Sequence, residues 1–327
     1  MYLIKALSQA RHRDGHILLT SEENGHCTKG QSSRLPADPE QANNLSMRNI
    51  SLLIVAMALL AQAHAALGQA QKEKDLPAPA EAAVETLKST PRHGEWVQVP
   101  LPGSDVKLKT WVVYPERKDK APVVIVIHEI FGLTDWVRAV ADQLAADGFL
   151  AVAPDLLSGK GPEGGGTESF AGDAVRAAIG KLTDDELVER LDAAKDWALA
   201  QPSAGAKFAT VGFCWGGTVS FMYATRQPKL GAAVVYYGTG PSDEAAMAKI
   251  QAPVLGLYGG DDARVTSTVQ ATDRAMVRAG KAFTHHTYEG AGHGFLRQQS
   301  GRDGANLKAA KAAWEETVEF LKKNLER

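Results

Sequence analysis

The stretch TVGFCWGGTVS, residues 210–220, sets a cysteine in a glycine-rich turn between two regular elements. The apolar run that leads into it, residues 208–213, predicts a strand, and a helix is expected to follow the turn. Gly212, Cys214 and Gly216 therefore form a G-x-C-x-G sequence at a strand–turn–helix junction. Three interpretations of the Cys214 thiol are open at this point: a nucleophile on a sharp turn, a buried space-filling group, or a redox group.

A G-x-C-x-G sequence at such a junction has the form of the nucleophile elbow of α/β-hydrolases, with cysteine where serine usually stands. The turn strains the backbone of the nucleophile, and side chains two positions before or after it would collide. The turn also directs backbone N–H groups and the N-terminus of a helix at the thiol, which favours a thiolate at Cys214.

Predicted strands and helices alternate along most of the chain, which is typical of a mostly parallel, doubly wound sheet with helices on both faces. An α/β-hydrolase fold in one domain over residues 94–327 accounts for all of them. An opening hairpin is expected at 95–99 and 106–114, around a Pro/Gly turn. The glycine-rich segment 158–167 is either a mobile rim of the site or a plain surface loop. The further predicted strands are 123–130, 149–156, 208–213, 231–238, 253–260 and 283–290, and the helices are 136–147, 184–200, one after Gly217, 266–279 and 305–325.

The N-terminal part of the chain has the layout of a secretory signal. From Met47, one positive charge precedes an apolar run and a small-x-small triplet, so residues 47–65 are expected to be a signal peptide. Residues 1–46 are then interpreted as a mis-annotated, disordered extension. Residues 66–93 are Ala-, Pro- and charge-rich and predict a flexible leader.

Export follows from this interpretation. Cleavage after Ala65 or Ala70 would give a periplasmic or secreted protein. The apolar run is far shorter than the ~18–20 residues that span a bilayer, so no membrane span is expected in the mature form. Cys27 lies in the predicted extension, which leaves Cys214 as the single cysteine of the mature chain. A lone thiol in an oxidising compartment is a liability unless it is buried or used.

The composition excludes several classes of function. The formal net charge of −2 and the lack of a basic stripe argue against a nucleic-acid partner. No H-E-x-x-H or C-x-x-C spacing occurs, so neither a metal site nor a disulfide-exchange centre is predicted, and no cofactor is expected.

Two further residues give Cys214 partners. Asp261 and Asp262 follow one predicted strand, and His293 follows the next. The order Cys214, Asp262, His293 is the nucleophile–acid–histidine order of α/β-hydrolases. In that arrangement the histidine moves protons while the carboxylate fixes its tautomer. The pattern does not decide with certainty between the two adjacent aspartates, and Asp262 is the one we assign to the triad.

The segments GFCWGG, YGGDDARV and YEGAGHGFLR resemble the dienelactone hydrolase (carboxymethylenebutenolidase) family over about residues 94–327. The resemblance implies a cysteine nucleophile at Cys214 and a catalytic glutamate at Glu129 that accepts the thiol proton when substrate displaces it. It also implies that the backbone N–H groups of Ile130 and Trp215 hold the oxyanion. Independently, a carboxylate ending an apolar strand must be paired, functional or exposed past the strand end, since burying a lone charge is costly.

The resemblance further implies arginines that bind a substrate carboxylate. Arg297 lies four residues after His293, and a guanidinium suits a planar carboxylate. Arg176 is the candidate for a second such arginine, although an exposed helical arginine is the competing interpretation.

The sequence therefore predicts a monomeric hydrolase of carboxylate-bearing lactones or related esters, of the dienelactone-to-maleylacetate type, with a small-molecule substrate. A broader carboxylesterase or thioesterase on the same triad is the first alternative. The second is a non-catalytic binding or redox-sensing module in which Cys214 is oxidised.

Overall fold

The computed structural model describes residues 76–326. The predicted extension (1–46), the signal peptide (47–65) and residues 66–75 of the predicted leader lie outside the described residues. Across residues 76–326, no helix combines the length and apolar character needed to cross a bilayer.

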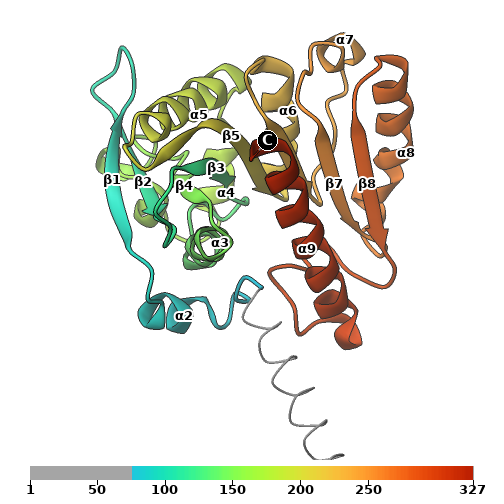
Figure 1. Cartoon of the computed structure of the whole chain (residues 1–327), viewed down its shortest axis with the longest axis horizontal. Helices are drawn as coiled ribbons and strands as arrows, with labels where there is room; N and C mark the ends of the chain where they lie inside the picture. Colours follow the sequence, from blue (N-terminus) through green and yellow to red (C-terminus); the bar gives the residue numbers. More distant parts are fainter. Residues whose placement is uncertain (1–75, 327) are drawn as a thin grey trace, which may run out of the picture. The chain divides into compact units, whose positions relative to one another are not determined.

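Within residues 76–326, eight strands form one sheet in the order β1-β2-β4-β3-β5-β6-β7-β8 (Figure 1). β1 pairs with β2, and β2 with β4, in antiparallel fashion, whereas every other neighbouring pair is parallel. This confirms the predicted α/β-hydrolase fold. The strands are β1 (Gly94–Pro100), β2 (Lys107–Val113), β3 (Ala121–Ile127), β4 (Leu150–Pro154), β5 (Ala204–Phe213), β6 (Ala232–Tyr236), β7 (Val254–Gly259) and β8 (Phe283–Tyr288).

Helices cover both faces of the sheet. Helices α3 and α9 pack on one face, and α5, α6 and α8 pack on the other. The short helices α2, α4 and α7 were not expected from the sequence, because segments of four to seven residues show little periodicity. The helices are α2 (Ala83–Ser89), α3 (Asp135–Ala146), α4 (Ala174–Ile179), α5 (Asp184–Leu199), α6 (Trp215–Arg226), α7 (Glu244–Met247), α8 (Ala263–Arg278) and α9 (Ala305–Leu325).

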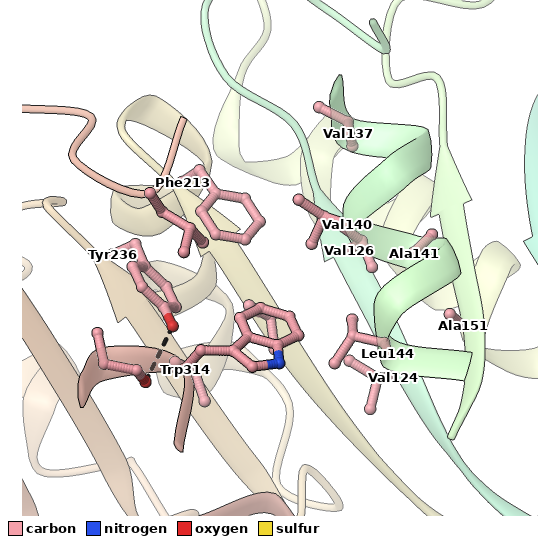
Figure 2. Packing of buried hydrophobic residues seen from close by; sticks show 14 of the residues in the cluster. Val124, Val126, Val137, Val140, Ala141, Leu144, Ala151, Phe213, Tyr236 and Trp314 are labelled. Atoms are coloured by element: carbon pink, nitrogen blue, oxygen red, sulfur yellow. Dashed lines mark hydrogen bonds between the residues drawn. The ribbon is translucent and has the colours of Figure 1, made fainter. Parts of the chain in front are cut away.

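Strand β3 is buried on both faces of the sheet, which explains why its sequence is a continuous apolar run. Val124 and Val126 point to the α3 side, where Figure 2 shows Val124 beside Leu144 and Val126 beside Val140. Ile125 and Ile127 point to the α5 and α6 side. Because successive side chains of a strand alternate between the faces, a strand covered on both sides must be apolar at every position.

The prediction of a flexible leader is wrong for residues 76–93. Residues 83–89 form α2, which packs on α3, and Ala83 is buried against the main core. The Ala- and Pro-rich composition carries no local signal for this arrangement, because the contacts that order the segment come from residues far away in the sequence.

The glycine-rich segment 158–167 is anchored by a buried aspartate. Asp155 Oδ2 accepts a hydrogen bond of 2.7 Å from the Thr167 N–H, and Asp155 Oδ1 accepts one of 2.7 Å from the Thr167 hydroxyl. The Thr167 hydroxyl oxygen in turn accepts the N–H of Leu133, at 3.1 Å. The end of the segment is thus tied to the turn that follows β3.

The core contains one polar contact whose contribution can be measured. Tyr236 and Thr317 are fully buried, and their hydroxyl oxygens lie 2.7 Å apart (Figure 2 marks a hydrogen bond at the Tyr236 hydroxyl). We expect Tyr236→Phe to lower the free energy of unfolding by about 1–2 kcal/mol, because it leaves a buried hydroxyl with one partner fewer. Urea denaturation measures the loss. Thr317→Val should be non-additive with Tyr236→Phe, and full additivity would contradict the contact.

Candidate active site

Cys214 lies at the junction of β5 and α6 in a strained backbone conformation. Its φ is 55° and its ψ is −116°, a region that L-residues with side chains rarely occupy. A Cβ atom on Gly212 would collide with the carbonyl of Gly216, and one on Gly216 would collide with the carbonyls of Ile127 and His128. The glycines are therefore required for the turn to close against the end of β3.

Cys214, His293 and Asp262 form a hydrogen-bonded chain. His293 Nε2 lies 3.1 Å from Cys214 Sγ, and His293 Nδ1 lies 2.5 Å from Asp262 Oδ2. Asp262 is buried at the start of α8, whereas Asp261 pairs with the exposed Arg302 at 2.9 Å. Of the two adjacent aspartates, only Asp262 contacts the histidine.

Glu129 is buried beside Arg297. The Glu129 carboxylate is 4% exposed, and its Oε2 lies 3.2 Å from Arg297 Nε. The two groups form an ion pair whose geometry is too poor for a hydrogen bond. Glu129 Oε2 and Arg297 Nε are therefore both buried without a hydrogen-bond partner among the described residues. A ligand with a carboxylate could take up the unused hydrogen-bonding capacity of the arginine.

Phe131 connects the two candidate arginines. The guanidinium of Arg297 lies 5.0 Å from the Phe131 ring centroid, and that of Arg176, on α4, lies 4.9 Å from the same centroid. Cation–π contacts of this kind hold planar guanidinium groups against an aromatic face. Arg176 is half-exposed and also pairs with Asp173, so it lies at the outer edge of the site.

Burial dominates the electrostatics of the thiol. Desolvation raises the pKa of Cys214, the N–H of Trp215 lowers it, and the negative charge of Glu129 raises it further. The thiol is thus neutral at rest. The Trp215 N–H at the start of α6 lowers the pKa of the thiol, in the direction expected for a helix N-terminus, but burial raises it by more.

The turn after β3 is fixed by a buried histidine. The Glu129 carbonyl accepts hydrogen bonds from His128 Nδ1, at 2.9 Å, and from the Gly132 N–H, at 3.1 Å. His128 Nε2 accepts the N–H of Leu156 at 3.3 Å, and burial lowers the pKa of this imidazole, so the ring is neutral with its proton on Nδ1. Because a trans peptide directs its C=O and N–H to opposite sides, the anchored carbonyl holds the Ile130 N–H pointing away from His128.

Tyr237 lies in the site, although the sequence favours core or rim packing for this residue over a place in the pocket. It follows β6 with a φ of 40°, is 1% exposed, and its ring lies 5.0 Å from that of His293. Its hydroxyl has no hydrogen-bond partner among the described residues. Burial, followed by the charges of Glu129 and Cys214, raises its pKa, so the hydroxyl is a neutral donor. The available signal was its position after the strand beside the elbow strand, where sites of this fold lie.

The arrangement is suited to acyl transfer. It combines a nucleophile with a proton-transferring histidine, a second buried carboxylate and backbone N–H groups near the turn. In the described part of the chain, no cluster of three or more His, Cys, Asp or Glu side chains could hold a metal ion.

Comparison with known proteins finds relatives that match most of the chain in sequence or in fold. The sequence model of the dienelactone hydrolase family matches residues 108–325. A carboxymethylenebutenolidase of Salmonella typhimurium (strain LT2) is 32% identical over 236 residues, covering 68% of this chain and 84% of the relative. One from Escherichia coli (strain K12) is 30% identical over 235 residues, with the same shares of 68% and 84%. A crystal structure of a dienelactone hydrolase from Klebsiella pneumoniae has a TM-score of 0.63 and 27% identity, covering 72% of this chain and 100% of that one.

The raised pKa of Glu129 predicts a pH dependence of stability. Burial raises this pKa from 4.5 to about 7, against the opposing charge of Arg297. Between these values the folded protein holds a proton that the unfolded chain releases, so the free energy of unfolding falls as the pH rises through this window. We expect the fall to amount to about 3 kcal/mol, because each tenfold change in proton affinity is equivalent to about 1.4 kcal/mol.

Glu129→Gln should remove this slope, which denaturant unfolding at a series of pH values measures. Glu85→Gln is the matched control, because Glu85 is exposed on α2. Identical slopes in the wild type and Glu129→Gln would contradict the prediction.

Proposed function

The chain belongs to the dienelactone hydrolase family of carboxylic ester hydrolases, and on this basis we propose that it opens carboxylate-bearing lactones, or cleaves related esters, through a thioester on Cys214. The observation that carries the proposal is the continuous contact from Cys214 Sγ to His293 and on to Asp262. A buried structural thiol would not need this chain of partners.

Substrate binding activates the thiol. The substrate carboxylate binds Arg297 and takes over the ion pair that the guanidinium makes with Glu129 in the free protein. Glu129 then holds a buried charge without a partner. Its pKa, about 7 while Arg297 opposes the effect of burial, rises when that opposing charge is taken up by the substrate, so the carboxylate can accept the proton of Cys214. Binding of a carboxylate therefore increases the ionised fraction of the thiol.

Acyl transfer then proceeds in two stages. The thiolate attacks the lactone carbonyl, and the N–H groups of Ile130 and Trp215 stabilise the oxyanion. Collapse of the tetrahedral intermediate breaks the ring C–O bond and leaves the acyl group on Cys214 as a thioester, while the leaving oxygen departs as an enolate. His293 takes a proton from water, the resulting hydroxide attacks the thioester, and the product carboxylic acid leaves as the C–S bond breaks and the Cys214 thiolate is released. The proton on His293 passes to the enolate oxygen and the proton on Glu129 returns to Cys214, which restores the free enzyme. Asp262 stabilises the imidazolium that forms in this stage.

We also propose that the mature protein is an exported monomer, produced by cleavage after Ala65 or Ala70. The charge, apolar run and small-x-small triplet that follow Met47 support export. N-terminal sequencing of the natural product tests it, and a mature chain that retains Met1 would contradict it. Size-exclusion chromatography with light scattering measures the oligomeric state.

Removing the guanidinium should alter the choice of substrate. We expect Arg297→Ala to raise KM for a carboxylate-bearing lactone by about 10–100-fold, since charge-assisted hydrogen bonds contribute about 1.5–3 kcal/mol. KM for a neutral aryl ester should change little. Steady-state kinetics on both substrates measure the ratio, with the half-exposed Arg176→Ala expected to have a smaller effect. An unchanged ratio in Arg297→Ala would favour the broader esterase or thioesterase.

Removing the imidazole distinguishes an enzyme from a thiol sensor. We expect His293→Ala to lower kcat by about 10²–10⁴-fold, the range for lost general acid–base catalysis. Cys214 should still react with iodoacetamide in this variant, which mass spectrometry verifies. A wild-type protein that hydrolyses neither lactones nor activated aryl esters would refute the hydrolase and leave the redox sensor.

A further inference from the structure

We propose that residues 76–92, which we call the N-terminal strap, are a specificity-determining part of the active site. The strap holds the backbone of the turn that carries Arg297 and so sets the position of the guanidinium that receives the substrate carboxylate. This inference rests on the proposed function of Arg297 and adds a second segment of chain to it.

The strap binds the main chain of the arginine directly. The N–H of Ala80 donates to the carbonyl of Arg297 at 3.0 Å. Two residues on, the buried Gln299 donates its side-chain amide to the carbonyl of Pro77, at 2.7 Å, and to that of Leu296, at 3.0 Å. The strap therefore contacts the turn on the carbonyl side of Arg297, while Gln299 joins the strap to the turn.

The same turn carries the histidine. The N–H groups of Arg297 and Gln298 both donate to the carbonyl of Gly294, at 2.9 Å, and Gly294 has a φ of 73°. His293 immediately precedes this glycine. The turn thus fixes the arginine on its N-terminal side through its own hydrogen bonds, whereas the strap fixes it on the C-terminal side.

The far end of the strap is fixed to the body of the protein. The Thr90 hydroxyl donates to Asp142 Oδ1 at 2.7 Å, and the guanidinium of Arg92 forms a two-point ion pair with the same carboxylate. Asp142 lies on α3 and is 2% exposed. Between the two anchors, Ala83 is buried in the main core. A segment fixed at both ends and in its middle can transmit a defined position to the turn.

The strap lies outside the part of the chain that the family's sequence model matches, which begins at residue 108. The catalytic elbow, Asp262, His293 and Arg297 all lie inside it. Reacting groups must be held to within about 1 Å for full activity, so a segment that positions the arginine can tune affinity without touching the chemistry.

The sharpest test removes a single N–H group. The Ala82 N–H donates to the Pro79 carbonyl at 3.0 Å, which makes residues 79–82 a turn with Ala80 in its second position. Proline is favoured at that position, so Ala80→Pro keeps the turn. It replaces the N–H that donates to Arg297 with a ring CH2 group, which both removes the hydrogen bond and displaces the Arg297 carbonyl. We expect KM for a carboxylate-bearing lactone to rise by about 3–10-fold, the equivalent of one hydrogen bond. KM and kcat for a neutral aryl ester should stay within about twofold, because such an ester makes no charged hydrogen bond to the guanidinium.

Gln299→Met is the second variant, because it keeps the volume of the side chain and removes the link to Pro77. It should likewise raise KM for the carboxylate-bearing lactone relative to KM for the neutral aryl ester. Lys88→Ala is the matched control, since Lys88 is exposed on α2 and pairs only with Glu85 among the described residues. Thermal unfolding of each variant separates positioning from stability: equal losses on both substrates, in step with a lower Tm, would overturn the inference.

Arg297→Ala, measured in parallel, separates the two proposals. If Arg297→Ala leaves the discrimination between the carboxylate-bearing lactone and the neutral aryl ester unchanged, the proposed function of the arginine fails. If Arg297→Ala abolishes the discrimination and Ala80→Pro leaves it intact, only the role of the strap fails. The double variant Ala80→Pro/Arg297→Ala should discriminate no differently from Arg297→Ala alone, and a further loss would overturn the inference.

Discussion

The positive φ at Cys214 is the constraint on which the rest of the site depends. A side chain in this conformation stores about 1–3 kcal/mol of strain, which persists only when surrounding structure enforces it. Here the enforcement comes from close packing, because Gly216 lies against the end of β3 and a Cβ on Gly217 would lie 2.6 Å from the Tyr236 carbonyl. β3 and β6 thus hold the elbow at the end of β5 between them. Glu129 and Tyr237 follow these two strands, whereas Asp262 and His293 follow β7 and β8, the next strands of the sheet.

Desolvation governs the charges around that elbow. It keeps the Cys214 thiol neutral and raises the pKa of Glu129, although Arg297 opposes the second effect. The pull of the helix N-terminus is smaller than the cost of ionising a group in this setting. In the mechanism that we propose, a carboxylate ligand reverses the balance, since it brings its own charge to the arginine. Binding and activation are then one event, and the enzyme need not hold a reactive thiolate while it waits.

The sequence was sufficient to predict the sheet, the larger helices and the residues at the strand ends. Buried strands and glycine turns leave local patterns, and in a parallel sheet the carboxyl ends of neighbouring strands meet at one edge. The place of Tyr237 in the site, where the sequence favours core packing instead, and the order of the N-terminal strap could not be predicted, for the opposite reason. The unpartnered Tyr237 hydroxyl and the link from Gln299 to Pro77 depend on residues that are distant in the sequence, so no local pattern records them.

A thiol that is neutral at rest also bears on the compartment proposed for this protein. Oxidation of cysteine proceeds through the thiolate, so a raised pKa slows it while the site is empty. A free, half-buried thiol such as Cys214 would otherwise be a liability in an oxidising environment. The buried environment that makes Glu129 a ready base thus also protects the nucleophile. The proposed mechanism disfavours neutral esters, which bring no charge to Arg297 and so leave most of the thiol protonated.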